Sequence, residues 1–309
     1  MPKFSVIIPV YNKANFISET LQSVLNQNYR DFEIIAVNDG STDNSLEILK
    51  GFKVENLRII NQENSGLSNA RNTGINEAKG TLIALLDGDD LWLPDHLKNL
   101  SFLAKNWPEA SIFGTAYTEL FPKGNTVNPK ISVALPQPGV IADFFEANFN
   151  QPLITPSSFS FKKEVVDDIG GFDPKITYSE DVDFFIRANL KFKLAYYPKV
   201  SCLYRVDSEN QITHSRISNL QPPDFKFYLQ QNPTHASLKK YINLKYYYLC
   251  NFYKTEGRLD LFKLIKAEIC VDLLNWKQRL LLAAPRIILL KIRALKTKFL
   301  LKGRRYTTF

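Results

Sequence analysis

The chain has 309 residues, which is enough for one large domain with an appended segment. Its contents of 45% hydrophobic and 23% charged residues are ordinary for a globular protein. The net charge of +8 is uneven: ten of the 39 basic residues and none of the 31 acidic residues lie in 276–309, so residues 1–275 carry −2, which argues against nucleic-acid binding by the main body.

The first hundred residues alternate short apolar runs with helical patterns, which is typical of an open α/β sheet. We expect four strands, at residues 4–10, 32–37, 57–60 and 81–86. Apolar residues spaced as on one helix face predict a helix from Ile17 to Leu25, and further helices are expected through 46–49 and over 67–78. Residues typical of helix ends predict the boundaries: Ser41 or Thr42 caps the second helix, Gly80 closes the third, and Pro94 opens a fourth at its first position.

The pattern is less regular from about residue 110. We expect strands at 111–117, 153–161 and 194–203, helices at 140–147 and 180–190 with Val182, Phe185 and Ile186 facing inward, and a loop over 121–138. After about residue 208 only helical patterns remain. The sequence therefore predicts a main α/β domain of residues 1–212 and a basic helical extension of residues 213–309.

Three carboxylates stand where the apolar run 81–86 ends, in the segment Asp87-Gly88-Asp89-Asp90. Like charges gathered at the end of a buried strand repel one another unless a cation or ordered donors neutralise them. Oxygen ligands without nearby Cys or His favour Mg²⁺ or Mn²⁺, which commonly also bind phosphate oxygens. The alternative is a polar turn, because Asp and Gly are common turn residues.

The basic tail offers two interpretations. Its longest apolar stretch, 280–295, is interrupted by Pro285, Arg286, Lys291 and Arg293, so it is too charged for a transmembrane helix. Long basic side chains could hold this segment at an anionic membrane surface. Alternatively, the tail forms a helical hairpin that packs on the main domain with a solvated basic face.

The cellular compartment is inferred from the cysteines and from the first residues of the sequence. Cys202, Cys250 and Cys270 are widely spaced and form no C-x-x-C pair, which predicts neither a disulfide framework nor a zinc site and fits a reducing compartment. Met1 leads directly into a strand-like run, so we expect no secretory signal. The expected location is the cytoplasm, peripheral to the inner face of the cell membrane.

Five segments in order resemble the motifs of the family 2 glycosyltransferases, inverting enzymes of the GT-A fold, and the resemblance covers about residues 3–210. They are Ser5-Val6-Ile7-Ile8-Pro9-Val10-Tyr11-Asn12; Val37-Asn38-Asp39-Gly40-Ser41-Thr42-Asp43; Asn64-Ser65-Gly66-Leu67-Ser68-Asn69-Ala70-Arg71-Asn72-Thr73-Gly74; Asp87-Gly88-Asp89-Asp90; and Gly170-Gly171-Phe172-Asp173 followed by Ser179-Glu180-Asp181. The resemblance implies a nucleotide-sugar-binding half over 1–110 and an acceptor-binding half over 111–212. Ligands of open sheets bind at the carboxyl ends of the strands, where several of these motifs lie.

The resemblance also implies roles on the donor side. Asp39 would accept a hydrogen bond from the uracil of a UDP-sugar, although an Asx turn is the alternative. Arg71 would lie near the diphosphate, or else on a helix surface. Asp89 would be the direct ligand of Mg²⁺ or Mn²⁺, with Asp87 meeting the metal or the ribose; the role of Asp90 is open. The full set of expected nucleotide-sugar contacts is Pro9, Tyr11, Asp39, Arg71, Asp87 and Gly88.

On the acceptor side the resemblance places the catalytic base at Asp181, with Glu180 as the second candidate. The alternative is that these carboxylates only complement a helix dipole. His214 would cap the diphosphate or the metal, or is simply exposed. Trp92 would either wall the sugar pocket or pack in the core, and the stretch Thr155-Pro156-Ser157-Ser158 is expected to line the acceptor side.

These features predict a metal-dependent inverting glycosyltransferase that moves a sugar from a UDP-sugar to a lipid-linked saccharide in cell-surface polysaccharide, lipopolysaccharide or capsule assembly. Its expected partners are the donor, the acceptor and an anionic membrane, with no nucleic acid. The alternatives are a sugar-nucleotide pyrophosphorylase, disfavoured because Pro9-Val10-Tyr11-Asn12-Lys13 lacks glycine, and a non-catalytic binding protein. The donor sugar, the linkage and the oligomeric state are left open.

Overall fold

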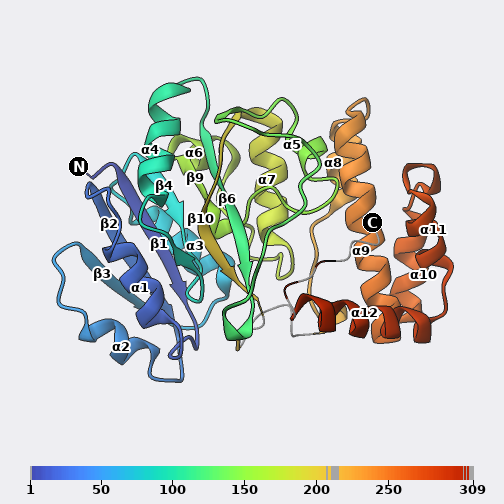
Figure 1. Cartoon of the computed structure of the whole chain (residues 1–309), viewed down its shortest axis with the longest axis horizontal. Coiled ribbons are helices and arrows are strands. Elements are labelled where there is room, and N and C mark those ends of the chain that lie inside the picture. The colour runs from blue at the N-terminus through green and yellow to red at the C-terminus, as the bar shows by residue number, and fades with distance from the viewer. Residues whose placement is uncertain (1, 207, 210–215, 302, 304, 306–309) are drawn as a thin grey trace.

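The computed structural model describes residues 2–206, 208–209, 216–301, 303 and 305. One ten-stranded mixed sheet runs through it in the order β3-β2-β1-β4-β9-β6-β10-β5, with β7 beside β6 and β8 beside β10 (Figure 1). The strands are β1 (Phe4–Val10), β2 (Phe32–Asp39), β3 (Leu57–Gln62), β4 (Leu82–Leu85), β5 (Leu91–Trp92), β6 (Ile112–Leu120), β7 (Thr126–Val127), β8 (Gly139–Val140), β9 (Phe159–Lys162) and β10 (Leu194–Arg205).

Helices cover both faces of this sheet. They are α1 (Ile17–Leu25), α2 (Ser45–Gly51), α3 (Leu67–Asn76), α4 (His96–Asn106), α5 (Phe144–Ala147), α6 (Glu164–Ile169) and α7 (Glu180–Lys191), followed by α8 (Phe225–Gln231), α9 (Ala236–Glu256), α10 (Leu259–Ala267), α11 (Trp276–Ala283) and α12 (Arg286–Leu300). The predicted α/β class with a helical C-terminal region is thereby confirmed.

The first four strands along the chain, β1 to β4, are parallel to one another, so their carboxyl ends lie at the same edge of the sheet. Every residue of β1 is buried. Its side chains alternate between the two layers, because Val6 and Ile8 join the hydrophobic cluster that contains α1 and α4, whereas Ile7 joins the cluster that contains α3 and α7. Burial on both faces explains why these strands appear in the sequence as nearly continuous apolar runs.

The C-terminal helices lie beside the part of the sheet layer that follows α4, next to α5 and α7, with α8 and α9 between it and α10 and α11 (Figure 1). Helix α9 joins the same hydrophobic cluster as α5 and α7, where the Tyr241 ring packs against Phe144 and Phe145. Among the described residues, none of the helices has the length and apolar character needed to span a membrane.

Most predicted elements are confirmed, but several ends are wrong. Helix α2 has Asn44 at its N-cap position, and Asp43 accepts the Ser45 N–H there, while the Ser41 hydroxyl accepts from the backbone of Asn12. Ser41 and Thr42 therefore tie the loop after β1 in place instead of capping a helix.

Gly80 and Pro94 also do something other than predicted. Helix α3 ends at Asn76, and Gly80 instead donates its N–H to the Ser5 hydroxyl at 2.8 Å, where an added Cβ would come within 2.6 Å of the Ser5 nitrogen. Pro94 precedes α4, which begins at His96 after Asp95, and the Pro94 carbonyl accepts the Asn28 N–H.

Two elements predicted after residue 138 are longer than the elements in the structure. The expected helix 140–147 is only the short α5, because residues 139 and 140 pair with β10 and Asp143 caps the helix by accepting the Glu146 N–H. The expected strand 153–161 contributes only β9. Before it, the Ser158 hydroxyl accepts the Thr155 N–H at 2.9 Å and holds the turn that starts at Pro156, which has no N–H for a strand ladder.

Candidate active site

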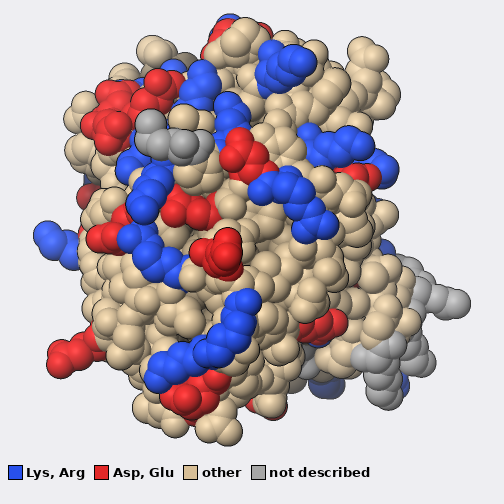
Figure 2. Space-filling model, turned by 90° about the vertical axis from the view of Figure 1, so that its left-hand side faces the viewer, with Lys and Arg blue, Asp and Glu red and all other residues tan. Residues whose placement is uncertain are grey.

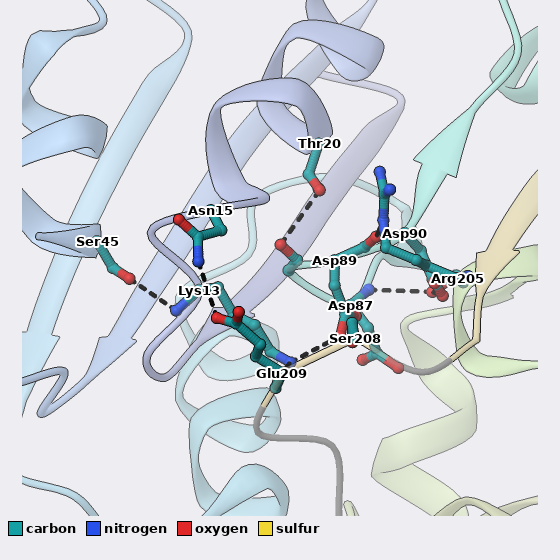
Figure 3. A network of polar contacts seen from close by, with 12 residues as sticks. Lys13, Asn15, Thr20, Ser45, Asp87, Asp89, Asp90, Arg205, Ser208 and Glu209 are labelled. Carbon is teal, nitrogen blue, oxygen red and sulfur yellow. Dashed lines mark hydrogen bonds and ion pairs between the residues drawn. The ribbon is translucent and has the colours of Figure 1, made fainter. Parts of the chain in front are cut away.

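The acidic segment 87–90 lies at the carboxyl edge of the sheet, directly after β4, and each of its carboxylates has a different partner (Figure 3). The Lys13 ammonium lies 2.6 Å from Asp89 Oδ2, and the Ser208 hydroxyl donates to the same oxygen. Lys13 follows β1, so the loops after two neighbouring strands meet here.

Asp90 has a structural role, because its hydrogen bonds connect the acidic segment to neighbouring elements. Its buried carboxylate accepts from the Ser157 hydroxyl at 2.6 Å and from the Arg205 N–H at 2.7 Å. Burial, followed by the charges of Asp89 and Asp87, raises the pKa of Asp90 well above its ordinary value. Asp90 thus ties the acidic segment to β10 and to the turn before β9.

Arg71 joins the donor-side and acceptor-side motifs. Its side chain is 1% exposed, and its two terminal nitrogens donate to Asp87 Oδ1 and Glu180 Oε1, each at 2.7 Å. The guanidinium also lies 5.1 Å from the centre of the Phe172 ring. Burial opposes the charge of Arg71, but the carboxylates of Asp87 and Glu180 outweigh it and raise the Arg71 pKa. Asp87 and Glu180, which are 16 and 109 positions from Arg71 in the sequence, therefore bind the same guanidinium.

Glu180 and Asp181 begin helix α7 and have different surroundings. Glu180 is buried and ion-paired with Arg71, whereas Asp181 is only partly buried and accepts the Val182 N–H at 2.8 Å. Burial raises the pKa of both carboxyls, and the Arg71 charge holds part of that rise back; at Asp181 the Lys245 charge does so too. Ser179, just before them, has a left-handed backbone with φ of 60°.

Asp39 ends β2 with both oxygens engaged. Oδ1 accepts from the Gln62 amide at 2.7 Å and from the Ser65 N–H at 2.9 Å, while Oδ2 accepts the Gly66 N–H at 2.9 Å. These donors belong to the segment that leads into α3. They fix the orientation of the Asp39 carboxylate, and its remaining lone pairs can accept from a ligand.

The other expected donor-side residues lie around the same edge. Tyr11 is 43% exposed after β1, whereas Pro9 is buried within that strand. Gly88 is close to both β1 and its loop, since an added Cβ would lie 3.1 Å from the Pro9 carbonyl oxygen and 3.3 Å from Cγ of Lys13. A small residue at position 88 lets these loops approach.

Trp92 is in the core and not in a wall of the cleft. It is 3% exposed, its indole N–H donates to the Ser157 carbonyl at 2.6 Å, and its ring stacks on His96. His214 lies outside the described residues.

Three residues near the site were not singled out from the sequence. Lys13 could have been found, because it directly follows the first motif. Ser157 lies within the stretch expected on the acceptor side, and its hydroxyl accepts the Asp87 N–H at 3.0 Å as well as donating to Asp90. Lys245 lies in a tyrosine- and lysine-rich helix that carries no sequence signal for a site.

The acidic residues fit a divalent metal only with help from a ligand. In the described part of the chain, no group of three or more His, Cys, Asp or Glu could hold a metal ion. Mg²⁺ often uses one or two carboxylates plus phosphate oxygens. Asp89 and Asp87 can supply such carboxylates, together with a bound diphosphate, once Lys13 leaves Asp89.

Comparisons with known proteins agree with this architecture. The family model of glycosyl transferase family 2 matches residues 5–170, more than half of the chain. The chain therefore belongs to glycosyl transferase family 2, of the GT-A type. The match ends before Ser179-Glu180-Asp181, so the structure and not the family model places that segment beside the donor-side motifs.

Two curated relatives are named glycosyltransferase or polysaccharide synthase. The putative glycosyltransferase EpsE of Bacillus subtilis is 34% identical over 146 residues, which is 46% of this chain and 52% of EpsE. The chondroitin synthase of Pasteurella multocida is 30% identical over 208 residues, which is 67% of this chain and 21% of the synthase. The chain thus spans about half or less of the curated relatives it matches.

A solved structure shares the fold at low sequence identity. TarS residues 1–349 from S. aureus, in complex with UDP-GlcNAc, superpose with a TM-score of 0.60 at 20% identity, covering 79% of this chain and 66% of TarS 1–349. A second structure of S. aureus TarS 1–349 superposes with a TM-score of 0.58 at 17% identity, and the match covers 99% of this chain and 93% of TarS 1–349. The fold shared with TarS 1–349 thus extends over nearly the whole chain, including its helical C-terminal region.

Proposed function

We propose that this protein is a metal-dependent, inverting glycosyltransferase that transfers a sugar from a UDP-sugar to a hydroxyl of a lipid-linked saccharide. The observation that carries the proposal is the bridge from Asp87 through Arg71 to Glu180, because it brings the donor motif and the acceptor motif to one point. Family membership and the UDP-GlcNAc held by the related TarS fold support the donor class.

Asp181 is the proposed base. It lies in the first turn of a helix beside the Arg71 bridge, it is partly exposed, and its carboxylate accepts a hydrogen bond from the adjacent backbone N–H of Val182. A raised pKa makes it a better proton acceptor than an ordinary aspartate. Glu180 is less suited, since its carboxylate is buried and neutralised by Arg71.

Charge on the departing nucleoside diphosphate would be balanced at the opposite side of the cleft. A divalent cation bound at Asp89 and Asp87 would supply electrostatic stabilisation of that leaving group. Arg71 holds Asp87 in position, and Asp39 orients the segment that leads into α3. An acceptor oxygen that attacks the anomeric carbon from the Asp181 side displaces the diphosphate in line, which inverts the configuration.

The membrane part of the proposal rests on α11 and α12. Large apolar side chains on these helices face solvent, among them Trp276 and Ile287, each 67% exposed, and Leu295, 54% exposed. Exposed basic residues on α12 lie among them, including Lys291 and Arg293. Apolar and cationic groups together suit an anionic bilayer surface. By contrast, the opposite end of the molecule shows basic and acidic residues interspersed (Figure 2).

The test uses the purified full chain with UDP-, GDP- and dTDP-sugars, with Mn²⁺ or EDTA. We expect Mn²⁺-dependent stabilisation in a thermal shift assay with one UDP-sugar and UDP release once a saccharide acceptor is added. The Asp89→Ala variant should lose the Mn²⁺-dependent part of nucleotide binding. Formation of UTP and sugar 1-phosphate when pyrophosphate is added to the UDP-sugar, with no release of UDP, would identify a pyrophosphorylase and overturn the proposal.

A further inference from the structure

A pocket of about 390 Å³ lies where the C-terminal helices meet the acceptor-side half, which is within the usual range for a small-molecule site. One wall comes from the loops around 148–152 and 178–179, and the other from α9 and α12. Most of the second wall therefore lies outside the family match, which ends at residue 170.

The charge of this pocket is positive. Its lining includes Lys245, Lys296 and Arg305 and, among the described residues, no carboxylate. Arg305 is ion-paired with Glu119, and Lys245 lies 4.6 Å from the centre of the Tyr241 ring. Burial lowers the pKa of Lys245 and of Lys296 to about 8. Both ammonium groups therefore remain mostly charged at pH 7, although burial has removed part of their hydration.

The pocket opens beside the proposed base. Tyr178 and Ser179 line it and directly precede Glu180 and Asp181. Burial lowers the pKa of Lys245, and the nearby Asp181 charge offsets part of that lowering. A molecule held at Lys245 would thus place neighbouring atoms near Asp181.

We propose that this pocket binds a phosphate group of the acceptor substrate, with Lys245 as its principal ligand. Two lysines favour a phosphate over a single carboxylate, because a phosphate carries up to two negative charges. The aromatic rings of Tyr241, Tyr248 and Phe252 line the same space and suit a sugar or chain attached to the phosphate. This inference rests on the proposed function, because it assigns the substrate class of the same site.

The first experiment measures glycerol phosphate binding to the full chain by calorimetry, with UDP and Mn²⁺ saturating so that the donor site is filled. We expect wild-type protein to bind glycerol phosphate and not glycerol or glucuronate. Lys245→Gln should weaken this binding at least tenfold. Lys239→Gln, an exposed lysine on the same helix and outside the pocket, is the matched control and should change nothing.

The readouts separate the two claims. If UDP itself does not bind, the proposed function fails. If UDP binds normally and Lys245→Gln keeps its melting temperature, but that variant binds glycerol phosphate as well as wild type does, this inference alone is overturned; the same holds if neither glycerol phosphate nor phosphatidic acid vesicles bind to wild type. Binding of glucuronate as tight as that of glycerol phosphate would also overturn the phosphate assignment.

A second arm distinguishes a soluble from a lipid-borne phosphate. Vesicles of phosphatidylcholine with and without phosphatidic acid replace glycerol phosphate in a flotation assay. Lys245-dependent binding in the soluble arm supports a soluble phosphate, and Lys245-dependent binding in the vesicle arm alone supports a lipid-borne one. Lys245-independent binding in both arms contradicts the pocket as a phosphate site.

Discussion

Arg71 shows how a single side chain can hold an active site together. A buried arginine is costly unless its charge is matched, and here two carboxylates match it from different elements. Asp87 comes from the end of β4 and Glu180 from the start of α7. The distance between the end of β4 and the start of α7 therefore depends on one guanidinium.

Replacing Arg71 with methionine tests this bridge. The change leaves Asp87 and the buried Glu180 without their partner, so we expect a loss of about 3–5 kcal/mol in the free energy of unfolding. Arg58→Met is the control, because Arg58 makes a similar 2.8 Å contact with Glu77 on the surface and should cost no more than about 1 kcal/mol. Urea unfolding of both variants measures the difference; equal losses would show that the Arg71 bridge contributes no more than a surface pair.

Replacing Asp181 with asparagine tests its proposed role as the catalytic base. In Asp181→Asn the amide cannot take a proton, so transfer should fall about 100-fold or more while UDP affinity stays near normal. UDP release and calorimetry measure the two quantities. A variant that turns over at the wild-type rate would remove Asp181 from the base role.

The pH profile gives a second readout for the same residue. Burial raises the pKa of Asp181, so the base is protonated, and kcat/KM falls, as pH decreases through a value above that of an ordinary aspartate. This acid limb should disappear from the residual activity of Asp181→Asn. If the acid limb of the pH profile is unchanged in Asp181→Asn, it reports the titration of a group other than Asp181.

At the scale of elements, the contact between α3 and β1 positions the site. Helix α3 carries Arg71, and its Gly74 faces Ile7 so closely that an added Cβ would lie 2.3 Å from Cγ2 of Ile7. Ile7 is fully buried and β-branched, so it has little freedom to move aside. The absence of a side chain at position 74 thus sets how near Arg71 comes to Asp87.

Gly74→Ala should therefore destabilise the protein by about 1–3 kcal/mol, although alanine is the better helix former. Gly51→Ala in α2 is the matched control, since an added Cβ there meets nothing within 4 Å, and it should be neutral or stabilising by about 0.5–1 kcal/mol. Thermal unfolding of both variants checks the sign. A stabilised Gly74→Ala would mean that α3 can move away from β1 without cost.

For the whole molecule, α11 and α12 are integrated with α9, which itself shares a hydrophobic core with α5 and α7 of the main body. The Lys254 ammonium donates to the Leu282 carbonyl at 2.9 Å, and Leu282 and Leu289 are buried. Deleting this region would open the core shared by α9 and α11, so membrane binding is better tested by changing exposed side chains in the full chain.

We expect the double variant Ile287→Ser and Leu295→Ser to bind vesicles of anionic lipid at least tenfold less than wild type, because two apolar groups no longer enter the bilayer. Phe102→Ser, which removes an exposed ring from α4 at a distance in sequence from the tail, is the control. Co-sedimentation with phosphatidylglycerol vesicles provides the measurement. Undiminished binding by the double variant would assign the lipid contact to another surface, or to charge alone.

The sequence by itself determined the sheet strands of the first ninety residues, the family and the motifs that face the carboxyl edge. It could do so because parallel strands buried on both faces leave long apolar runs, and because the chain turns at the end of each strand. Short polar stretches were less predictable. The turn before β9 and the cap of α5 depend on side chains such as Ser158 and Asp143, which bond to the local backbone in place of strand or helix partners.

Only the tertiary structure decided which charges meet. The Arg71 bridge, the Lys13 contact with Asp89 and the approach of Lys245 to Asp181 join residues far apart in the chain. Periodicity reports which face of an element is buried, but it does not report which elements pack together. The pairing of distant charges follows from that packing, and so the positive pocket beside the proposed base was visible only once α9 and α12 were placed against the acceptor-side half.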